Sequence, residues 1–362
     1  LTPAHHSLNR LASYEPLSCV GAYVFDAAEG CVRRIFARAT ILATGGLGQI
    51  FLHTTNPAVA TGDGLAMADR AGARIINAEY IQFHPTAFYH RGRARFLVTE
   101  SLRGEGGRLL NINGEPFMQR YAPEWKDLAP RDVVARGIHE EMLRTGAPHV
   151  YLDIASAMPA EKIKERFPTV YEKCQEYDVD PSEESMPVVP AAHYFCGGVW
   201  VDEWGRTNLE RLYAVGEVSC TGVHGANRLG SASMLEGLVW GVRAAMDIQR
   251  NPSNWKSINP RDIPPWEEAE VVDTVDPALI EHDMADIKHT MWYYVGLLRT
   301  RRRLERALRD LNNLRQDIDA FYRTTRLSKR IISLRNATLS AIIVAQAAWE
   351  NRESHGCHYR EN

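Results

Sequence analysis

The chain has 362 residues, of which 45% are hydrophobic and 24% charged, and its formal net charge is −3. This length and hydrophobic content are enough for two or three folded domains. No long run of one charge occurs, and the short basic cluster at 301–303 lies inside a helical pattern, so binding to DNA or RNA is not indicated.

The cysteine pattern favours a reducing, cytoplasmic location. The six cysteines are scattered, with no C-x-x-C pair and no Cys/His spacing typical of zinc, so no metal is expected. The apolar stretch at 337–349 is too short to cross a bilayer, and glycine, asparagine and proline interrupt the one at 39–62, so no membrane contact is expected. No signal peptide is visible, and because the first residue is not Met we expect the true N-terminus to be missing.

The first elements indicate an α/β fold. The pattern predicts strands at 19–25, 31–37 and 39–44, the last ending in two glycines. A buried strand that runs into a glycine turn is where α/β folds place ligands, although an ordinary strand-to-loop turn has the same pattern. A helix predicted at 65–72 follows, with Asp63 where its cap would lie; Asp63 caps this helix, binds a cofactor hydroxyl, or does both.

The middle of the chain resembles a separate lid-like domain inserted into the first. Polar motifs there alternate with three helical patterns, at 132–143, 160–167 and 170–176. The proline-containing segment at 187–190 marks the expected return, and residues 196–250 resume strand, turn and helix. A proline-rich link that includes Pro252 then leads to a helical region with apolar patterns at 304–322 and 331–349, which we interpret as packing faces.

The run from 216 to 237 is rich in glycine and carries one central arginine, Arg228. Glycines let a backbone approach a flat cofactor closely, and the helix expected from Ser233 offers free N–H groups to an electron-rich partner. Arg228 is a candidate anion clamp. A glycine-rich connection with one surface arginine is the alternative.

Several other polar residues could act on a small dianion. Glu100 and Arg103 lie three positions apart, as a structural ion pair or a proton relay. Arg131 opens a helix whose dipole disfavours it, unless an acid pairs with it. Two arginines and two histidines, with one neutral hydroxyl donor, could hold two carboxylates; the histidines and the donor are His84, His193 and Thr99. No nucleophile elbow, P-loop or H-E-x-x-H is present, so hydrolysis and phosphoryl transfer are not supported.

Seven motifs in order make the chain resemble the fumarate reductase/succinate dehydrogenase flavoprotein family. They are A-T-G-G at 43–46, T-G-D-G at 61–64, Q-F-H-P-T at 82–86, T-E-S-L-R-G-E-G at 99–106, P-R-D-V-V-A-R at 130–136, A-H-Y-F-C-G-G at 192–198 and H-G-A-N-R-L at 224–229. Within the family, the segments at 189–194 and 291–307 are similar to the branch that oxidises L-aspartate. A succinate dehydrogenase or fumarate reductase flavoprotein subunit and a non-catalytic fragment are the alternatives.

The resemblance implies non-covalent FAD and a fold of the α/β plus α+β class. We expect an incomplete Rossmann-like FAD-binding domain at 1–80 and 193–255, an inserted capping domain at 81–192 and a helical domain at 256–362. The implied activity is oxidation of L-aspartate to iminoaspartate, with hydride transfer to FAD and reoxidation by oxygen or fumarate. Its product would pass to quinolinate synthase, in NAD biosynthesis.

The resemblance also assigns residues. Those expected to contact FAD are Ala43, Thr44, Gly45, Asp63, Glu217, Ser233 and Met234. Those expected to bind the dicarboxylate are His84, Thr99, His193 and Arg228, and Arg131 is the expected proton-transfer residue, with Glu100 and Arg103 as its relay. The sequence departs from the family in having no N-terminal G-x-G-x-x-G unit, in Met234, where Leu is usual, and at 355–357, where H-G-C replaces R-G-L.

Overall fold

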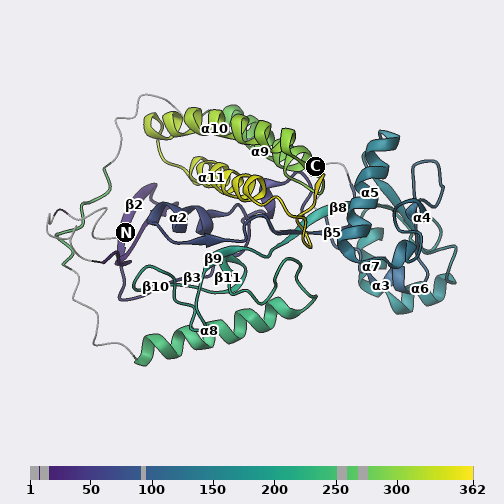
Figure 1. Ribbon diagram of the computed structural model, residues 1–362, viewed down its shortest axis with the longest axis horizontal. Coiled ribbons are helices and arrows are strands. Elements are labelled where there is room, and N and C mark those ends of the chain that lie inside the picture. Colours follow the sequence, from purple (N-terminus) through teal and green to yellow (C-terminus); the bar gives the residue numbers. More distant parts are fainter. Residues whose placement is uncertain (1–7, 9–15, 91–94, 251–258, 268–275, 362) are drawn as a thin grey trace. The chain divides into compact units, whose positions relative to one another are not determined.

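A computed structural model describes residues 8, 16–90, 95–250, 259–267 and 276–361. The chain divides into two compact units, drawn in Figure 1. Unit 1 comprises residues 1–52, 57–81 and 194–362, and unit 2 comprises 53–56 and 82–193. The expected link residue Pro252 and the expected domain boundary at 255 lie outside the described residues.

Unit 1 contains short strands that end in glycine-rich loops. β3 (Thr40–Leu42) pairs in parallel with β10 (Leu212–Ala214). A second small sheet has the order β11-β9-β4, and β1 and β2 form an antiparallel hairpin. The bounds of these strands are Gly21–Asp26 for β1, Cys31–Phe36 for β2, Ile75–Ile76 for β4, Gly198–Trp200 for β9 and Ser219–Cys220 for β11. The three strands expected before residue 45 are therefore present.

Two helices of unit 1 carry expected cofactor residues at their N-terminal ends. α2 (Asp63–Ala71) begins after Gly62, which is the N-cap, so Asp63 is the first helical residue and not the cap. α8 (Ala232–Arg250) follows the glycine-rich run. Asp247, near the end of α8, accepts a hydrogen bond from the Tyr213 hydroxyl at 2.8 Å, which ties this helix to β10. Two 3-10 turns, Gly48–Ile50 and Gly216–Val218, complete the loops.

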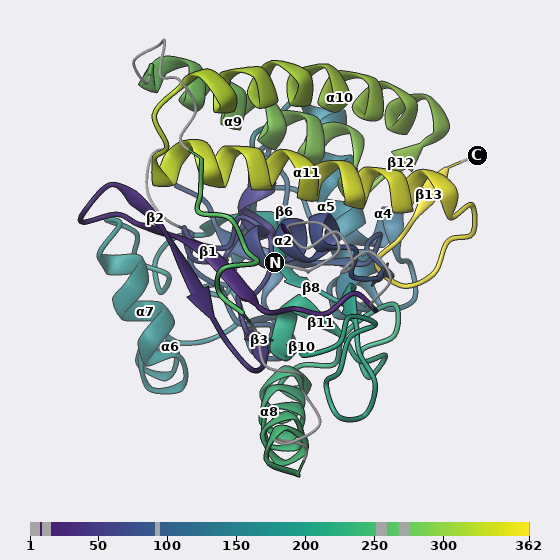
Figure 2. The ribbon, with the colours of Figure 1, turned by 90° about the vertical axis from the view of Figure 1, so that its left-hand side faces the viewer.

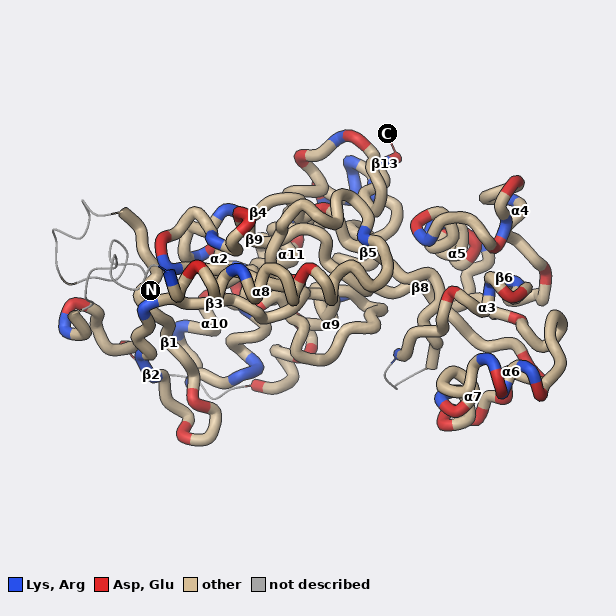
Figure 3. The backbone as a smooth tube through the Cα atoms, turned by 90° about the horizontal axis from the view of Figure 1, so that it is seen from below, with Lys and Arg blue, Asp and Glu red and all other residues tan. Residues whose placement is uncertain are grey.

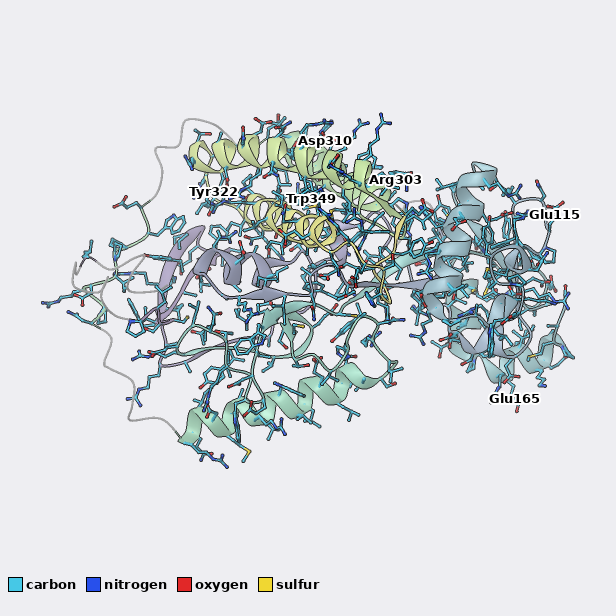
Figure 4. The ribbon with its side chains drawn as sticks, viewed as in Figure 1. Glu115, Glu165, Arg303, Asp310, Tyr322 and Trp349 are labelled. Atoms are coloured by element: carbon cyan, nitrogen blue, oxygen red, sulfur yellow. The ribbon has the colours of Figure 1, made fainter. Side chains whose placement is uncertain are left out.

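The remaining helices of unit 1 are α9 (Pro277–Tyr294), α10 (Arg301–Thr324) and α11 (Lys329–Glu350). Figure 2 shows α11 lying alongside α10. Arg335 of α11 lies 4.4 Å from the ring centroid of Tyr322, a residue of α10 labelled in Figure 4. The short strands β12 (Arg299–Thr300) and β13 (Arg360–Glu361) pair in parallel and fasten the C-terminal segment.

α11 is longer than the apolar stretch recognised in the sequence. It has 22 residues and is the one helix in the described part of the chain that is long and apolar enough to cross a membrane. Of its most apolar window, 56% is buried inside the protein, against α10, α9 and α2. A core helix has the same composition, so this finding is weak evidence for a membrane span.

Unit 2 is built on a sheet with the order β5-β8-β7-β6. Its strands are β5 (Ile81–Phe88), β6 (Arg108–Leu110), β7 (Val150–Asp153) and β8 (Met186–Phe195). The segment at 187–190, where the chain was expected to return from the inserted domain, is part of the ten-residue strand β8. Its prolines cannot donate to a ladder, but the Pro187 carbonyl still accepts a hydrogen bond from the Tyr89 N–H at 2.8 Å.

The helices of unit 2 agree with the sequence pattern to within about two residues. α5 (Arg131–Thr145), α6 (Ala160–Arg166) and α7 (Pro168–Gln175) occupy the three predicted positions. Shorter turns are α3 (Ser101–Gly104), α4 (Met118–Tyr121) and a 3-10 turn at Lys126–Leu128. Acidic and basic residues alternate along α6 and α7 (Figure 3), as expected for solvated helices.

Candidate functional site

In unit 1, the turn after β3 lies against the acid of the glycine-rich run. A Cβ atom added at Gly46 would lie 2.2 Å from Glu217 Oε1, so the Glu217 carboxylate lies directly against the backbone of Gly46. Glu217 Oε1 accepts a hydrogen bond from the Phe195 N–H at 2.9 Å. Burial raises the pKa of Glu217 above its ordinary value, and this backbone hydrogen bond opposes the rise. The loop after β3 and the loop after β10 therefore meet at Glu217.

Thr44 and Asp63 lie beside this turn. A Cβ atom at Gly64 would lie 1.8 Å from Thr44 Oγ1, so the end of β3 and the start of α2 are in close contact. Asp63 Oδ1 accepts a hydrogen bond from Asn336 Nδ2 of α11 at 2.9 Å. Asp63 thus has a structural partner that the sequence did not indicate, because that partner is 273 residues away.

Ser233 and Met234 occupy the first turn of α8. Met234 is 80% exposed, and the Ser233 hydroxyl accepts a hydrogen bond from Arg228 Nη1 at 3.0 Å. The first N–H groups of a helix have no partner within the helix, so this end of α8 offers donors to a polar ligand.

These residues fit a large flat cofactor. Gly45 and Gly216 have positive φ angles of 73° and 70°, and a Cβ atom at either would meet no other atom within 4 Å. Open space therefore adjoins the backbone where the two strand-end loops turn. The exposed residues 43–45, the half-buried acid Glu217 and the N-terminal N–H groups of α8 are the donors and acceptors that a flavin nucleotide would contact. In the described part of the chain no His, Cys, Asp or Glu group could hold a metal ion.

Arg228 is buried in unit 1, with 8% of its surface exposed. Its guanidinium carbon lies 4.2 Å from the centroid of the Tyr194 ring. The sequence alternative, a lone surface arginine in a loose loop, is wrong, because this side chain is enclosed and oriented.

Unit 2 brings together two of the predicted histidines. The ring centroids of His84 and His193 are 5.6 Å apart, with the rings edge to face. Burial holds the pKa of His84 well below its ordinary value, and the nearby His193, Arg131 and Arg103 lower it further. His84 is therefore neutral near pH 7, and its Nδ1 accepts the Thr86 N–H at 3.2 Å, which leaves the proton on Nε2.

His193 is oriented by Thr55, a residue that the sequence did not indicate. The Thr55 hydroxyl and His193 Nδ1 are 2.9 Å apart. Thr55 precedes His193 by 138 residues, so no local pattern could have connected them.

Glu100 bridges the two candidate relay arginines of unit 2. Its Oε2 accepts from Arg131 Nε at 2.6 Å, and its Oε1 accepts from Arg103 Nη2 at 3.1 Å. Arg103 is buried and also donates to the Asp127 carbonyl. Burial lowers the pKa of Arg103, and the Glu100 charge works in the opposite direction. The pairing of Arg131 with an acid, which the sequence left open as the structural alternative to a functional role, is present, and the acid is Glu100.

Thr99 lies next to this cluster in sequence and directs its hydroxyl to the following turn. Its Oγ1 accepts the Ser101 N–H at 3.3 Å and lies 3.4 Å from Ser101 Oγ. The hydroxyl therefore helps to begin α3, and it donates its own proton to Ser101 Oγ.

The chain was compared with known proteins. Residues 4–234 match the family described as FAD binding domain, and residues 284–362 match the one described as fumarate reductase flavoprotein C-term. The chain therefore belongs to the FAD binding domain family, the class of flavoproteins that the glycine-rich loops of unit 1 indicate, and it requires FAD as cofactor.

Its curated relatives include L-aspartate oxidases. L-aspartate oxidase 1 of Ralstonia nicotianae is 46% identical over 343 residues, which cover 95% of this chain and 64% of that protein. L-aspartate oxidase of Pseudomonas aeruginosa is 47% identical over 342 residues, which cover 94% of this chain and 63% of that protein. The chain thus spans less than two thirds of the length of these relatives.

Solved structures agree with the fold. Sdh1 of Mycobacterium smegmatis in complex with UQ1 is 34% identical, with a TM-score of 0.80, and covers 98% of this chain and 61% of its own. A quinol-fumarate reductase with menaquinol molecules is 27% identical, with a TM-score of 0.82, and covers 99% and 65%. The mixed α/β and α+β class, the FAD-binding fold and the family resemblance predicted from the sequence are confirmed.

Proposed function

We propose that this chain carries out the flavin-dependent oxidation of L-aspartate to iminoaspartate. The observation that carries the proposal is the cluster in unit 2, in which Glu100 bridges Arg131 and Arg103 near the neutral His84. Cationic and neutral donors gathered around one acid suit a dianionic substrate that must lose a proton. The similarity to L-aspartate oxidases supports the choice of substrate.

We assign dicarboxylate binding to His84, Thr99, His193 and Arg228. The neutral imidazole of His84 donates a hydrogen bond to a carboxylate without adding the cost of a buried charge, whereas a guanidinium binds it through two parallel bonds. Thr55 contacts Nδ1 of His193 and so fixes the orientation of this ring.

Oxidation of the amine removes a hydride from Cα and a proton from nitrogen. We assign acceptance of this proton to Arg131, and we assign its transfer away from Arg131 to Glu100 and Arg103. A free guanidinium is a poor base, since its pKa is above about 12. Arg131 must therefore give a proton of its own to Glu100, whose partly exposed carboxylate releases it to water, and the neutral guanidine then accepts the proton from nitrogen. The buried Arg103, whose pKa is lowered, is the second contact of that carboxylate.

The residues that would hold FAD are Ala43, Thr44, Gly45, Asp63, Glu217, Ser233 and Met234. The chemistry that FAD supplies when bound is acceptance of the hydride and delivery of two electrons to oxygen or fumarate, giving peroxide or succinate. We further propose that iminoaspartate is consumed by quinolinate synthase in NAD biosynthesis. The six cysteines form no disulfide with one another, which supports a reducing, cytoplasmic location.

The alternative function is that of a succinate dehydrogenase or fumarate reductase flavoprotein subunit. It is favoured by the solved structures named above and needs the same dicarboxylate-binding residues. A non-catalytic apo fragment is the third possibility. One experiment separates the three.

The purified chain is titrated with FAD, and the loaded protein is mixed anaerobically with L-aspartate or with succinate. We expect the visible flavin band to appear on titration and to bleach faster with L-aspartate. Faster bleaching with succinate would favour the alternative subunit. A protein that stays colourless at saturating FAD would overturn the proposal in favour of the apo fragment.

A further inference from the structure

A buried polar cluster of unit 1 lies directly against Arg228. Tyr194 and Glu236 are 8% and 3% exposed, and the Tyr194 hydroxyl donates to Glu236 Oε2 at 3.2 Å. His224 Nε2 is 2.8 Å from the same oxygen. The other oxygen of Glu236 accepts from the Thr221 hydroxyl. The carboxylate at the start of α8 therefore gathers three side chains.

The hydrogen bonds fix the protonation of this cluster. His224 Nδ1 is buried and has no hydrogen-bond partner among the described residues, whereas Nε2 faces the carboxylate. A buried N–H without an acceptor is costly, so the proton lies on Nε2 and is donated to Glu236. Burial and the Glu236 charge raise the pKa of Tyr194, which keeps its hydroxyl protonated. Glu236 accordingly holds the Tyr194 ring in one orientation.

That ring is what Arg228 contacts. The guanidinium carbon lies 4.2 Å from the ring centroid, within the range of a cation–π interaction, and Nη1 donates to Ser233. The two contacts come from different parts of the chain: Tyr194 precedes the glycine-rich run at 216–237, and Ser233 lies within it, five residues after Arg228. Between them they leave the plane of the guanidinium little freedom to turn.

We infer that Tyr194, held by Glu236 and His224, is a positioning residue that orients the Arg228 guanidinium for bidentate binding of a carboxylate. The inference rests on the proposed function of Arg228. The cluster does not touch the substrate in this account. It removes orientational freedom from the arginine before binding, so less is lost when the carboxylate arrives.

If the cluster only stabilised α8, loss of any buried tyrosine bound to this helix would weaken carboxylate binding equally. The chain offers a matched control for this comparison. Tyr213 is also buried, and its hydroxyl also donates to a carboxylate of α8, that of Asp247, at 2.8 Å. Asp247 is bound by Arg206 and lies near the opposite end of α8 from Ser233, which Arg228 contacts. Loss of the Tyr213 ring therefore perturbs the same helix and leaves the Arg228 contact intact.

The experiment measures succinate binding by titration calorimetry for the unaltered chain, Tyr194→Leu, Tyr194→Phe and Tyr213→Leu. Loss of a desolvated cation–π contact should weaken binding by about 5- to 30-fold in Tyr194→Leu. Tyr194→Phe keeps the ring face but loses the hydrogen bond to Glu236, so it should weaken binding less than Tyr194→Leu does. Tyr213→Leu should stay within about threefold of the unaltered chain. Equal affinities of the two leucine variants would overturn the inference.

A second readout does not need the substrate. Phenylglyoxal modification of Arg228, followed by peptide mass spectrometry, reports how firmly the guanidinium is held. It should be several-fold faster in Tyr194→Leu than in Tyr213→Leu or the unaltered chain. If the unaltered chain fails to bind succinate, the proposed function falls, and this rate alone decides the inference; unchanged modification rates would refute it.

Discussion

The helix that begins with Arg131 is anchored at its other end by a buried acid, Glu141. The side chain of Glu141 has no exposed surface and accepts hydrogen bonds from Asn111 Nδ2 at 3.0 Å and from the Tyr121 hydroxyl at 2.9 Å. Arg120 and Arg144 pair with it at 2.7 and 2.6 Å. Glu141→Gln removes the charge that these donors share while keeping nearly the same volume.

The magnitude follows from the titration of this acid. Hydrogen bonds from Arg144, Asn111 and Tyr121 lower the pKa of Glu141 from 4.5 to about 2, against the effect of burial. A lowered pKa of this size contributes roughly 3 kcal/mol to the free energy of unfolding near pH 7. Because the folded-state pKa is depressed, the contribution is complete above about pH 4.5 and is lost as the pH falls toward 2. Glu141→Gln should therefore be destabilised by roughly 3 kcal/mol at pH 7, and the difference should shrink by roughly 2 kcal/mol at pH 3.

Urea denaturation, read by circular dichroism and by hydrogen exchange of the α5 amides, measures this difference. Glu176→Gln is the matched control, because Glu176 belongs to the same unit, is exposed and pairs with the exposed Lys173. The control should change stability by less than about 0.5 kcal/mol. A loss below about 1 kcal/mol in Glu141→Gln at pH 7, or an equal loss at pH 3, would refute the reasoning.

Three further substitutions test the site. Gly64→Ala places a Cβ atom 1.8 Å from Thr44 Oγ1 and should destabilise the protein by about 2–3 kcal/mol. The double variant with Thr44→Ala should recover part of this loss, and chemical denaturation of both variants measures the two stabilities. Equal stability of Gly64→Ala and the unaltered chain would contradict the contact. Arg131→Lys should lower kcat of the FAD-loaded enzyme at least about 100-fold while KM stays within about threefold, since it disrupts proton transfer and not uniform binding; a change confined to KM would argue against the transfer role. Arg228→Ala should weaken succinate binding about 30-fold or more, because it removes a buried cation that pairs with a carboxylate; calorimetry that finds unchanged affinity would remove Arg228 from the binding site.

The sequence predicted those features that depend on neighbours along the chain. Apolar periodicity located α5, α10 and α11, and the glycine turn after β3 was recognised from its pattern. The strand β8 was not predicted, because two prolines lie within its ten residues and proline cannot donate a hydrogen bond to a neighbouring strand. The two prolines lack an N–H group, but the Pro187 carbonyl still accepts a hydrogen bond, and β8 still pairs with β7 over residues 186–188.

The site was predicted at the level of residue types and not of partners. The spacing of Glu100 and Arg103 allowed an ion pair, and the structure adds Arg131 to the same carboxylate. Hydrogen-bond partners from distant segments cannot be predicted from local spacing, and the contact of Thr55 with His193 is an example. The assignment of residues to FAD or dicarboxylate stays a prediction.

The most direct test of the account follows the substrate hydrogen. The FAD-loaded chain is mixed anaerobically with L-aspartate carrying hydrogen or deuterium at Cα, and bleaching of the flavin band is timed. Hydride transfer from Cα predicts that the band bleaches with L-aspartate and that deuterium slows it several-fold. A flavin band that L-aspartate leaves unchanged would contradict the account.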